Sequence, residues 1–228
     1  MKVSREIPLE GIQKVVAKKM MESRQGTAAV TAMAEVRCAA ALAELGRLRE
    51  SIPGLTLTHL LIKAAAMCLR DHPRLNATLR DDMITEFAEI NISLAVSSPS
   101  GELMLVVIRD ADTKGLDDIA AEARALQERA IANQLKLPDV TGGTFTLSNY
   151  GMLQTVVWST PIITPGQVGV LGSGRAAPRA VVGEEGGIVA DVVLPLSLTY
   201  DHRVINGVPA GRYLDAVAEH LQTGRWKS

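Results

Sequence analysis

The chain has few cysteines, few aromatic residues and no long apolar run. Its two cysteines, Cys38 and Cys68, are too few for a disulfide framework or a metal site built from thiolates. Aromatic residues make up only 3% of the chain, whereas 47% of it is hydrophobic, so the core must be mainly aliphatic. No apolar stretch approaches the roughly 20 residues of a membrane span, and no signal segment follows residues 1–6. We therefore expect a cytoplasmic protein without a membrane partner.

Neither sign of charge dominates. The 24 lysines and arginines nearly balance the 25 aspartates and glutamates, which gives a formal net charge of -1. Nucleic-acid binding requires a basic patch or stripe, so this balance gives no indication of a nucleic-acid partner. The length suits one α/β domain with a sizeable core, and no repeat, low-complexity tract or long linker divides the chain. We predict a single mixed α/β domain over residues 1–228.

Helical periodicity recurs along the chain. Apolar residues at helical spacing predict helices over residues 9–24, 59–71, 117–135 and 208–221, and an alanine-rich segment predicts another helix that ends near residue 50. Thr58 is expected to cap the helix over residues 59–71. His59 and His72 stand at the two ends of that helix, where solvated or capping roles are expected.

The remaining apolar segments predict strands. They cover residues 28–37, 90–97, 103–108, 144–148, 168–172 and 188–199. The segment 90–97 alternates and should be half-buried, whereas 103–108 is continuously apolar and should be an inner strand. Turn residues predict a hairpin near residues 80–82, a turn at 99–101, a loop at 137–143 and a hairpin tip at 183–187.

The most informative stretch is residues 194–207. It begins as a buried strand and ends in Asn206-Gly207, a pair typical of a turn. His202 is therefore presented at the end of a strand, where its geometry is held and the following turn leaves room for a substrate. A histidine in such a place suits a general base. On these residues alone, a histidine satisfied inside the core remains the alternative.

The run Leu-Ser-Leu-Thr-Tyr-Asp-His-Arg-Val-Ile-Asn-Gly, residues 196–207, resembles the Asp-His-Arg-x-x-Asp-Gly signature of the dihydrolipoamide acyltransferases, the core components of 2-oxo acid dehydrogenase complexes. Residues 73–77 (Pro-Arg-Leu-Asn-Ala), 143–149 (Gly-Thr-Phe-Thr-Leu-Ser-Asn) and 160–163 (Thr-Pro-Ile-Ile) extend the resemblance, in order and spacing, over nearly the whole chain. It implies a chloramphenicol acetyltransferase-like two-layer sandwich, a mixed sheet flanked by helices, that forms a homotrimer with active sites at the subunit interfaces.

The resemblance also implies a reaction. An acyl group would move between the thiol of dihydrolipoamide and the thiol of coenzyme A. A free thiol is mostly protonated at neutral pH, so the chemistry needs a base that takes its proton during attack on a thioester, and His202 matches that base. Ser148 matches a family serine that donates to the tetrahedral oxyanion from across a subunit interface. Without the His202 signature, Ser148 would be read as an ordinary strand hydroxyl.

Coenzyme A needs cations for its phosphates. Arg47, by rough alignment, and Arg175, which follows Gly172 and Ser173 at a strand end, are the candidates for binding it. Solvation is the ordinary role of an exposed arginine and is the alternative for both. No metal is implied.

Three features depart from the family pattern: residue 206, the segment 152–158, and Val106, where a proline is customary. Asn206 replaces the usual aspartate, and Gln13 stands where an arginine is thought to pair with that aspartate. Because both charges are missing together, no buried ion is left unpaired, and Asn206 is expected to orient the histidine loop in a neutral pair with Gln13. Larger side chains over residues 152–158 replace glycines and should narrow the acyl pocket or the lipoyl channel, although Trp158 is expected in the core.

The chain ends bear on assembly and partners. Because the sequence begins at the resembling domain, no lipoyl or peripheral-subunit-binding domain is expected, and the lipoyl group would come in trans. Only Trp226 is suited to anchor a contact between trimers, so a free trimer and a 24-subunit cage both remain open. An acyltransferase with a non-lipoyl acceptor and a non-catalytic assembly subunit are the alternatives. The sequence does not distinguish acetyl, succinyl and branched-chain acyl groups.

Overall fold

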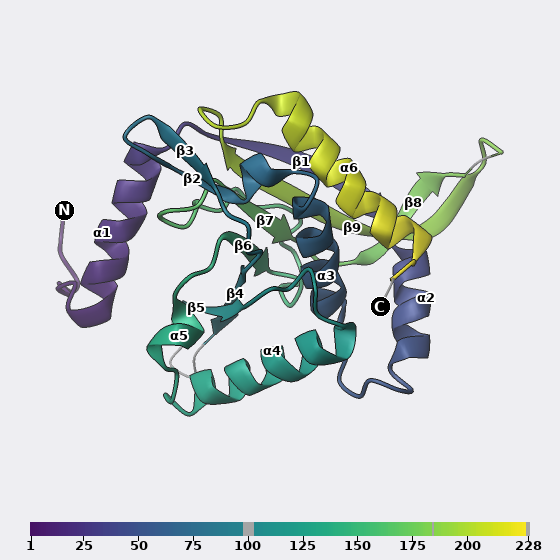
Figure 1. The fold of residues 1–228 in the computed structure, drawn as a ribbon, viewed down its shortest axis with the longest axis horizontal. Coiled ribbons are helices and arrows are strands. Elements are labelled where there is room, and N and C mark those ends of the chain that lie inside the picture. Colours follow the sequence, from purple (N-terminus) through teal and green to yellow (C-terminus); the bar gives the residue numbers. More distant parts are fainter. Residues whose placement is uncertain (98–102, 184, 227–228) are drawn as a thin grey trace.

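A mixed β-sheet organises the computed structural model, which describes residues 1–97, 103–183 and 185–226 (Figure 1). The strands lie in the order β1 (Ala29–Arg37), β9 (Ile188–Asp201), β7 (Gly169–Ser173), β6 (Phe145–Asn149), β4 (Ile92–Ser97) and β5 (Leu103–Ile108). Strands β4, β6 and β7 run parallel to one another, and the other neighbours pair antiparallel. Parallel neighbours cannot be joined by a tight hairpin. The chain therefore makes crossover connections before it adds β6 beside β4 and β7 beside β6.

Two hairpins complete the strands. β8 (Ala177–Val182) pairs with the N-terminal part of β9, and this hairpin projects from the body at the right of Figure 1. β2 (Ala77–Arg80) and β3 (Met83–Glu86) form a separate two-stranded sheet. The hairpins predicted near residues 80–82 and 183–187 are therefore confirmed. The turn predicted at residues 99–101 lies outside the described residues.

Helices cover one face of the main sheet. They are α2 (Ala39–Leu48), α3 (Leu57–Leu69), α4 (Leu116–Ile131) and α6 (Gly207–Thr223). The core between the layers is aliphatic, as the composition predicts, with Phe145 and Tyr213 as its largest fully buried side chains. Helix α1 (Gly11–Gly26) stands apart from this layer, and residues 1–10 extend away from the body (Figure 1). The two-layer α/β class is confirmed.

The second face of the sheet is polar. On β9, Leu196 and Leu198 point into the core, so the intervening Ser197 and Thr199 point to the opposite face. Asn91 and Ser93 are only 2% and 3% exposed, so the prediction of a half-buried strand here was wrong. The reason is a buried network: the Gln167 amide donates to Ser93 Oγ at 3.3 Å, and the Asn91 amide donates to the carbonyl oxygen of Gly142 at 3.0 Å.

Other sequence predictions also need correction. β5 is an edge strand and not an inner one; its apolar run is covered by α4 and by α5 (Leu137–Val140), a short helix within the predicted loop. Helix α3 begins two residues early, after Thr56, whose backbone N–H donates to His59 Nδ1 at 3.2 Å, so the capping role of His59 is confirmed. Thr58 is therefore inside the helix. His72 is half-buried, with its ring edge-on to Tyr213.

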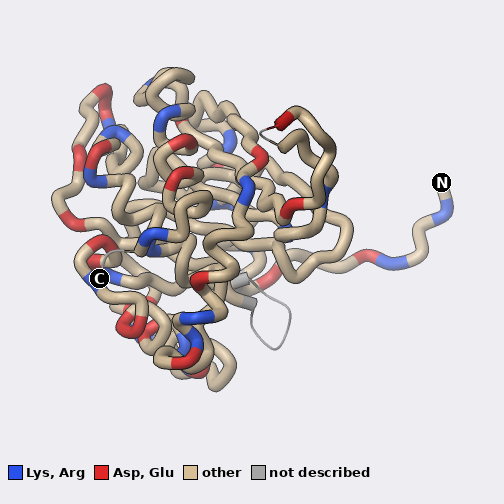
Figure 2. The backbone as a smooth tube through the Cα atoms, turned by 90° about the vertical axis from the view of Figure 1, so that its right-hand side faces the viewer, with Lys and Arg blue, Asp and Glu red and all other residues tan. Residues whose placement is uncertain are grey.

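Charged residues of both signs lie near one another along the chain. Lys/Arg and Asp/Glu positions are interspersed along the backbone (Figure 2). In the part of the chain that the structure describes, no helix is long and apolar enough to cross a membrane. Within the same residues, no group of three or more His, Cys, Asp and Glu side chains is placed to hold a metal ion.

Candidate active site at the end of strand β9

His202 follows the last residue of β9, in a tight turn that leads into α6. Its backbone N–H donates to the carbonyl oxygen of Ala28 at 2.9 Å, which ties the turn to the start of β1. The turn is closed by the N–H groups of Val204 and Ile205, which both donate to the carbonyl oxygen of Asp201. The His202 side chain is exposed, and its ring lies 5.8 Å from that of buried Tyr200. The histidine is therefore held at its backbone, and its exposed ring is accessible to a proton donor, as a general base must be.

Asp201 anchors this turn. The residue is 2% exposed, and its carboxylate accepts hydrogen bonds from the Arg203 guanidinium, with a shortest distance of 2.6 Å, and from the backbone N–H groups of Arg203 and Ala28. Burial raises the pKa of Asp201, but the Arg203 side chain and these N–H groups outweigh burial and hold it below its ordinary value. The sequence analysis placed His202 in a family signature but did not predict that Asp201 and Arg203 hold its turn. The signal that could have predicted this is a carboxylate and a guanidinium on either side of the histidine.

The lowered pKa of Asp201 predicts a specific loss of stability in acid. A carboxyl group whose pKa is lower in the folded state contributes stability above its unfolded-state value and loses that contribution as the pH falls through the folded value. Chemical unfolding of the wild type and Asp201→Asn should therefore be compared from neutral pH to below 3.8, the ordinary value. We expect the stability difference between them to shrink as the pH falls. A difference that stays constant would show that the carboxylate charge contributes nothing.

Ser148 lies on β6, on the polar face. Its neighbour Leu147 is part of the core, so Ser148 points away from the helices and is half-buried. Ser148 pairs with Gly172 on β7, and Gly172 pairs with Ser197 on β9. The predicted serine therefore has a fixed place in the sheet register.

The structure does not bring His202 and Ser148 together within one chain. His202 is five positions beyond Ser197 on β9, which at about 3.4 Å per residue is about 17 Å along the strand, with two strand spacings in addition. A side chain cannot span that distance. Within one chain, His202 and Ser148 are therefore too far apart for both side chains to reach the same atom.

The predicted neutral pair between Asn206 and Gln13 is absent. Asn206 is the N-cap residue of α6 and makes no side-chain capping bond, and Gln13 lies on α1. Both side chains are exposed, and among the described residues no hydrogen bond joins them. Because α1 stands apart from the helical layer, the two positions that sequence comparison couples do not meet within one chain (Figure 1).

The predicted coenzyme A residues are dispersed. Arg47 lies on α2 and its guanidinium pairs with Glu44, with a shortest distance of 2.5 Å. Ser173 is buried and its hydroxyl donates to the carbonyl oxygen of Gly174, so it is not available to a ligand in this conformation. Gly172 belongs to the Ser148 row, and Arg175 follows it in an exposed position. Binding of coenzyme A therefore stays a prediction for these four residues, Arg47, Gly172, Ser173 and Arg175.

The segment 152–158 has large apolar side chains that are exposed. Met152 is 80% exposed, Leu153 48% and Trp158 38%, so Trp158 is not a core residue as the sequence suggested. Gly174 allows this segment to pass over β7, because a Cβ there would collide with the carbonyl oxygen of Val157. The chain thus exposes an apolar segment close to the strand end that follows Ser148.

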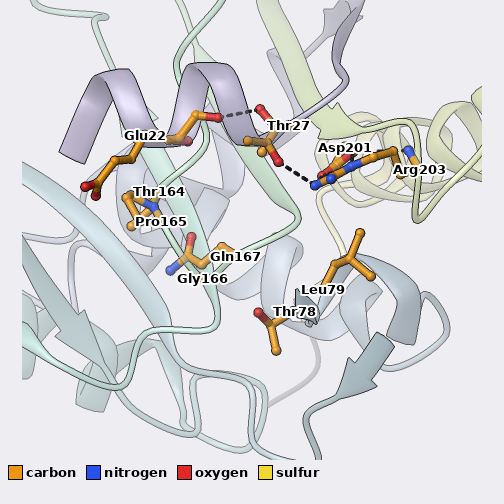
Figure 3. A pocket seen from close by; sticks show the side chains of 12 residues that line it. Glu22, Thr27, Thr78, Leu79, Thr164, Pro165, Gly166, Gln167, Asp201 and Arg203 are labelled. Atoms are coloured by element: carbon orange, nitrogen blue, oxygen red, sulfur yellow. Dashed lines mark hydrogen bonds and ion pairs between the residues drawn. The ribbon is translucent and has the colours of Figure 1, made fainter. Parts of the chain in front are cut away.

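A small pocket of about 180 Å³ opens beside the histidine turn (Figure 3). Asp201 and Arg203 line one side, and Glu22 of α1 and the 164–167 turn line another. The Ser23 hydroxyl donates to the carbonyl oxygen of Ile163 and fastens α1 to this loop. Neither His202 nor Ser148 lines the pocket, so it is not by itself an acyl-transfer site.

Neither cysteine offers a second nucleophile. Burial, with a smaller contribution from the Asp191 charge, raises the pKa of Cys38 to about 11. Burial likewise raises the pKa of Cys68 to about 12. Both cysteines are free and buried. A buried thiol that stays protonated is inert, so a covalent acyl-cysteine step has no support here.

The layered mixed sheet with a histidine at the end of its longest strand defines a chloramphenicol acetyltransferase-like fold. A chloramphenicol acetyltransferase matches with a TM-score of 0.58 at 18% identity over 91% of this chain and 93% of that one, a likeness of fold alone. A family model described as 2-oxoacid dehydrogenases acyltransferase (catalytic domain) matches residues 2–225. The chain belongs to that family.

Relatives and solved structures agree with this assignment. The chain is 35% identical over 227 residues to the dihydrolipoyllysine-residue acetyltransferase component of the Corynebacterium glutamicum pyruvate dehydrogenase complex, covering 95% of this chain and 33% of that protein. It is 34% identical to the corresponding component of the Bacillus subtilis acetoin cleaving system, covering 96% and 56%. The chain thus spans between a third and just over half of these relatives' lengths.

Two crystal structures are similar over nearly the whole chain. A probable dihydrolipoamide acetyltransferase from Listeria monocytogenes has a TM-score of 0.91 at 32% identity, covering 96% of this chain and 94% of that one. The Azotobacter vinelandii dihydrolipoamide acetyltransferase has a TM-score of 0.89 at 29% identity, covering 96% and 91%. That structure was studied for the roles of a serine, a histidine and an asparagine in its catalytic mechanism.

Proposed function

We propose that this chain is an acyltransferase domain that moves an acyl group between a dihydrolipoyl thiol and the thiol of coenzyme A. The observation that carries the proposal is the exposed ring of His202 on a turn fixed by Asp201 and by the Ala28 carbonyl. The serine, histidine and asparagine studied in the Azotobacter vinelandii enzyme have counterparts of the same types here in Ser148, His202 and Asn206. Histidine and asparagine are four positions apart in both chains.

In this mechanism His202 takes the proton of the attacking thiol. The sulfur then bonds to the carbonyl carbon of the thioester, and a tetrahedral oxyanion forms. Ser148 donates a hydrogen bond to that oxyanion, and when the intermediate collapses the proton on His202 passes to the departing thiol sulfur. The residues therefore return to their starting protonation states, and the same steps run in either direction.

We further propose that the site is shared between copies of the chain, as a homotrimer. The separation of about 17 Å along β9 within one chain supports this, because a base and an oxyanion donor must reach the same carbonyl group. Trp226 packs against its own core and lies 6.1 Å from His220, ring centre to ring centre, so it does not project as an anchor for a larger cage. The trimer is the proposed unit, in the cytoplasm, and assembly of trimers into a 24-subunit core stays a prediction.

The activity is tested by transfer to coenzyme A from acetyl-, succinyl- and isobutyryl-dihydrolipoamide on the purified chain. Turnover with one donor supports the proposal and gives the acyl class. The exposed Met152, Leu153 and Trp158 favour a second candidate, an acyltransferase with an apolar non-lipoyl acceptor. Transfer from acyl-coenzyme A to small apolar thiols or alcohols, in the absence of dihydrolipoamide turnover, would favour that candidate. A folded trimer silent in every assay would instead favour an assembly subunit.

A shared site predicts that two inactive variants restore each other. If His202→Ala and Ser148→Ala chains are coexpressed in equal amounts, random trimers should contain intact sites at about one quarter of the interfaces, because each site draws its base and its serine from different chains. We expect about one quarter of wild-type turnover, measured on the purified mixed trimer. A mixture as inactive as its two parents, with mixed trimers verified by mass spectrometry, would place both residues of each site in one chain.

A further inference from the structure

Two hydroxyl oxygens on the polar face of the sheet are buried without a hydrogen-bond partner among the described residues. They belong to Tyr150, in the turn after β6, and to Ser197 on β9. Ser197 is only 1% exposed. Buried polar groups in native proteins are nearly always paired, so two orphan hydroxyls on one face call for an explanation. Neither residue has a role in the proposed reaction.

Both oxygens lie against Gly172. A Cβ at this glycine would collide with Tyr150 Oη and with Ser197 Oγ, so the absence of a side chain is what lets the tyrosine reach the sheet. Gly172 pairs with Ser148 on one side and with Ser197 on the other. The tyrosine hydroxyl therefore lies in the same cross-strand row as Ser148. Each oxygen lies 2.4 Å from the position of that Cβ, so both are within reach of a single bridging water.

The residues that follow Ser148 are held by hydrogen bonds on the core face and in the plane of the sheet. On the core side, the Asn149 side-chain amide donates to Thr58 Oγ1 at 2.7 Å, and Asn149 Oδ1 accepts a hydrogen bond from the Gly151 N–H at 2.7 Å. In the plane of the sheet, the backbone N–H of Tyr150 donates to the carbonyl oxygen of Ser173 at 2.9 Å. The hydroxyl of Tyr150 would add a side-chain anchor on the face to which Ser148 points.

We propose that Tyr150 is a positioning residue for Ser148, with its hydroxyl linked over Gly172 to Ser197 Oγ by a bridging water. This inference rests on the proposed function, in which Ser148 donates to the oxyanion. Such a donor is effective because its direction is fixed before the reaction, and a serine next to the end of a strand needs the following turn to be held. The Tyr150–Ser197 pair fixes that turn, and so directs the Ser148 hydroxyl toward the shared site.

The test removes one hydroxyl at a time and asks whether the effect passes through Ser148. Tyr150→Phe keeps the ring and should lower kcat about 10- to 100-fold, with the KM for coenzyme A little changed, because a displaced group of the site is costly. Ser197→Ala should do the same. In a Ser148→Ala background, Tyr150→Phe should change kcat by less than about twofold, since the group that it positions is already gone.

Tyr213→Phe is the matched control. Its hydroxyl is also buried but donates to the carbonyl oxygen of Ala65 in the helical layer, so the same deletion should lower the melting temperature and leave kcat unchanged. Wild-type kcat in both Tyr150→Phe and Ser197→Ala would overturn the inference, as would an equal loss with and without Ser148. Unimpaired turnover in Ser148→Ala itself would overturn the proposed oxyanion role instead, so the two failures are distinguishable.

Discussion

Replacement of His202 by alanine is expected to lower kcat by about 10²- to 10⁴-fold, the range for loss of a general base. Both thiols in the proposed reaction are mostly protonated at neutral pH, so without the imidazole only the small thiolate fraction can attack. The exposed ring contributes little packing, and the turn is held by Asp201 and by backbone hydrogen bonds. The melting temperature should therefore stay close to that of the wild type while turnover of acyl-dihydrolipoamide falls.

His220→Ala is the control for this variant. His220 is half-buried on α6, with its ring stacked on Trp226, and it has no place in the proposed chemistry. Its removal should leave kcat at the wild-type value. Wild-type turnover in His202→Ala would remove the general base from the mechanism, and the family fold would then have to carry another activity.

Local patterns were sufficient for most of the secondary structure. The apolar run before Asp201 and the Asn206-Gly207 pair predicted β9 and the turn that presents His202, because strand and turn preferences act over a few residues. The same reasoning placed β5 inside the sheet. A continuous apolar run reports burial on both faces, but it does not say whether strands or helices supply the cover, and here α4 and α5 do.

The buried polar side chains were beyond local patterns. Asn91 and Ser93 alternate with apolar residues and were expected to face solvent, yet Gln167, more than 70 positions away, satisfies the Ser93 hydroxyl inside the protein. Hydrogen bonds between residues so far apart in the chain leave no periodic pattern in the sequence. Trp158 fails for a related reason, since the size of an aromatic ring predicts burial only when a neighbouring surface is available within the chain.

The candidate site, too, could be predicted only in part. The signature around His202 and the block around Ser148 identified two residues by type and spacing, and the structure places each on a rigid strand end or strand. The distance between them follows only from the sheet register, which no local pattern contains. The register is therefore what converts two motifs into the hypothesis of a site shared between chains.

Replacement of Ser148 by alanine is expected to raise the activation barrier by about 2.7–4 kcal/mol, a loss of about 10²- to 10³-fold in kcat, the range for one oxyanion donor. The hydroxyl is needed most in the transition state, when the carbonyl oxygen becomes negative, so kcat should fall far more than the KM for either substrate rises. Steady-state kinetics with acyl-dihydrolipoamide and coenzyme A measure both parameters. Because Ser148 is half-buried and only an oxygen is removed, the fold should persist.

Ser93→Ala separates this effect from a general loss of polar contacts on the same face. Ser93 Oγ accepts from the Gln167 amide, and that amide also donates to the carbonyl oxygen of Gly143 at 2.9 Å, so the network keeps one bond without the serine. We expect Ser93→Ala to lower stability slightly and to leave kcat unchanged. If both variants lost turnover equally, in proportion to their melting temperatures, Ser148 would be a structural hydroxyl. If Ser148→Ala alone is slow, the oxyanion is stabilised from β6, and the about 17 Å to His202 in the same chain requires the base to come from another copy.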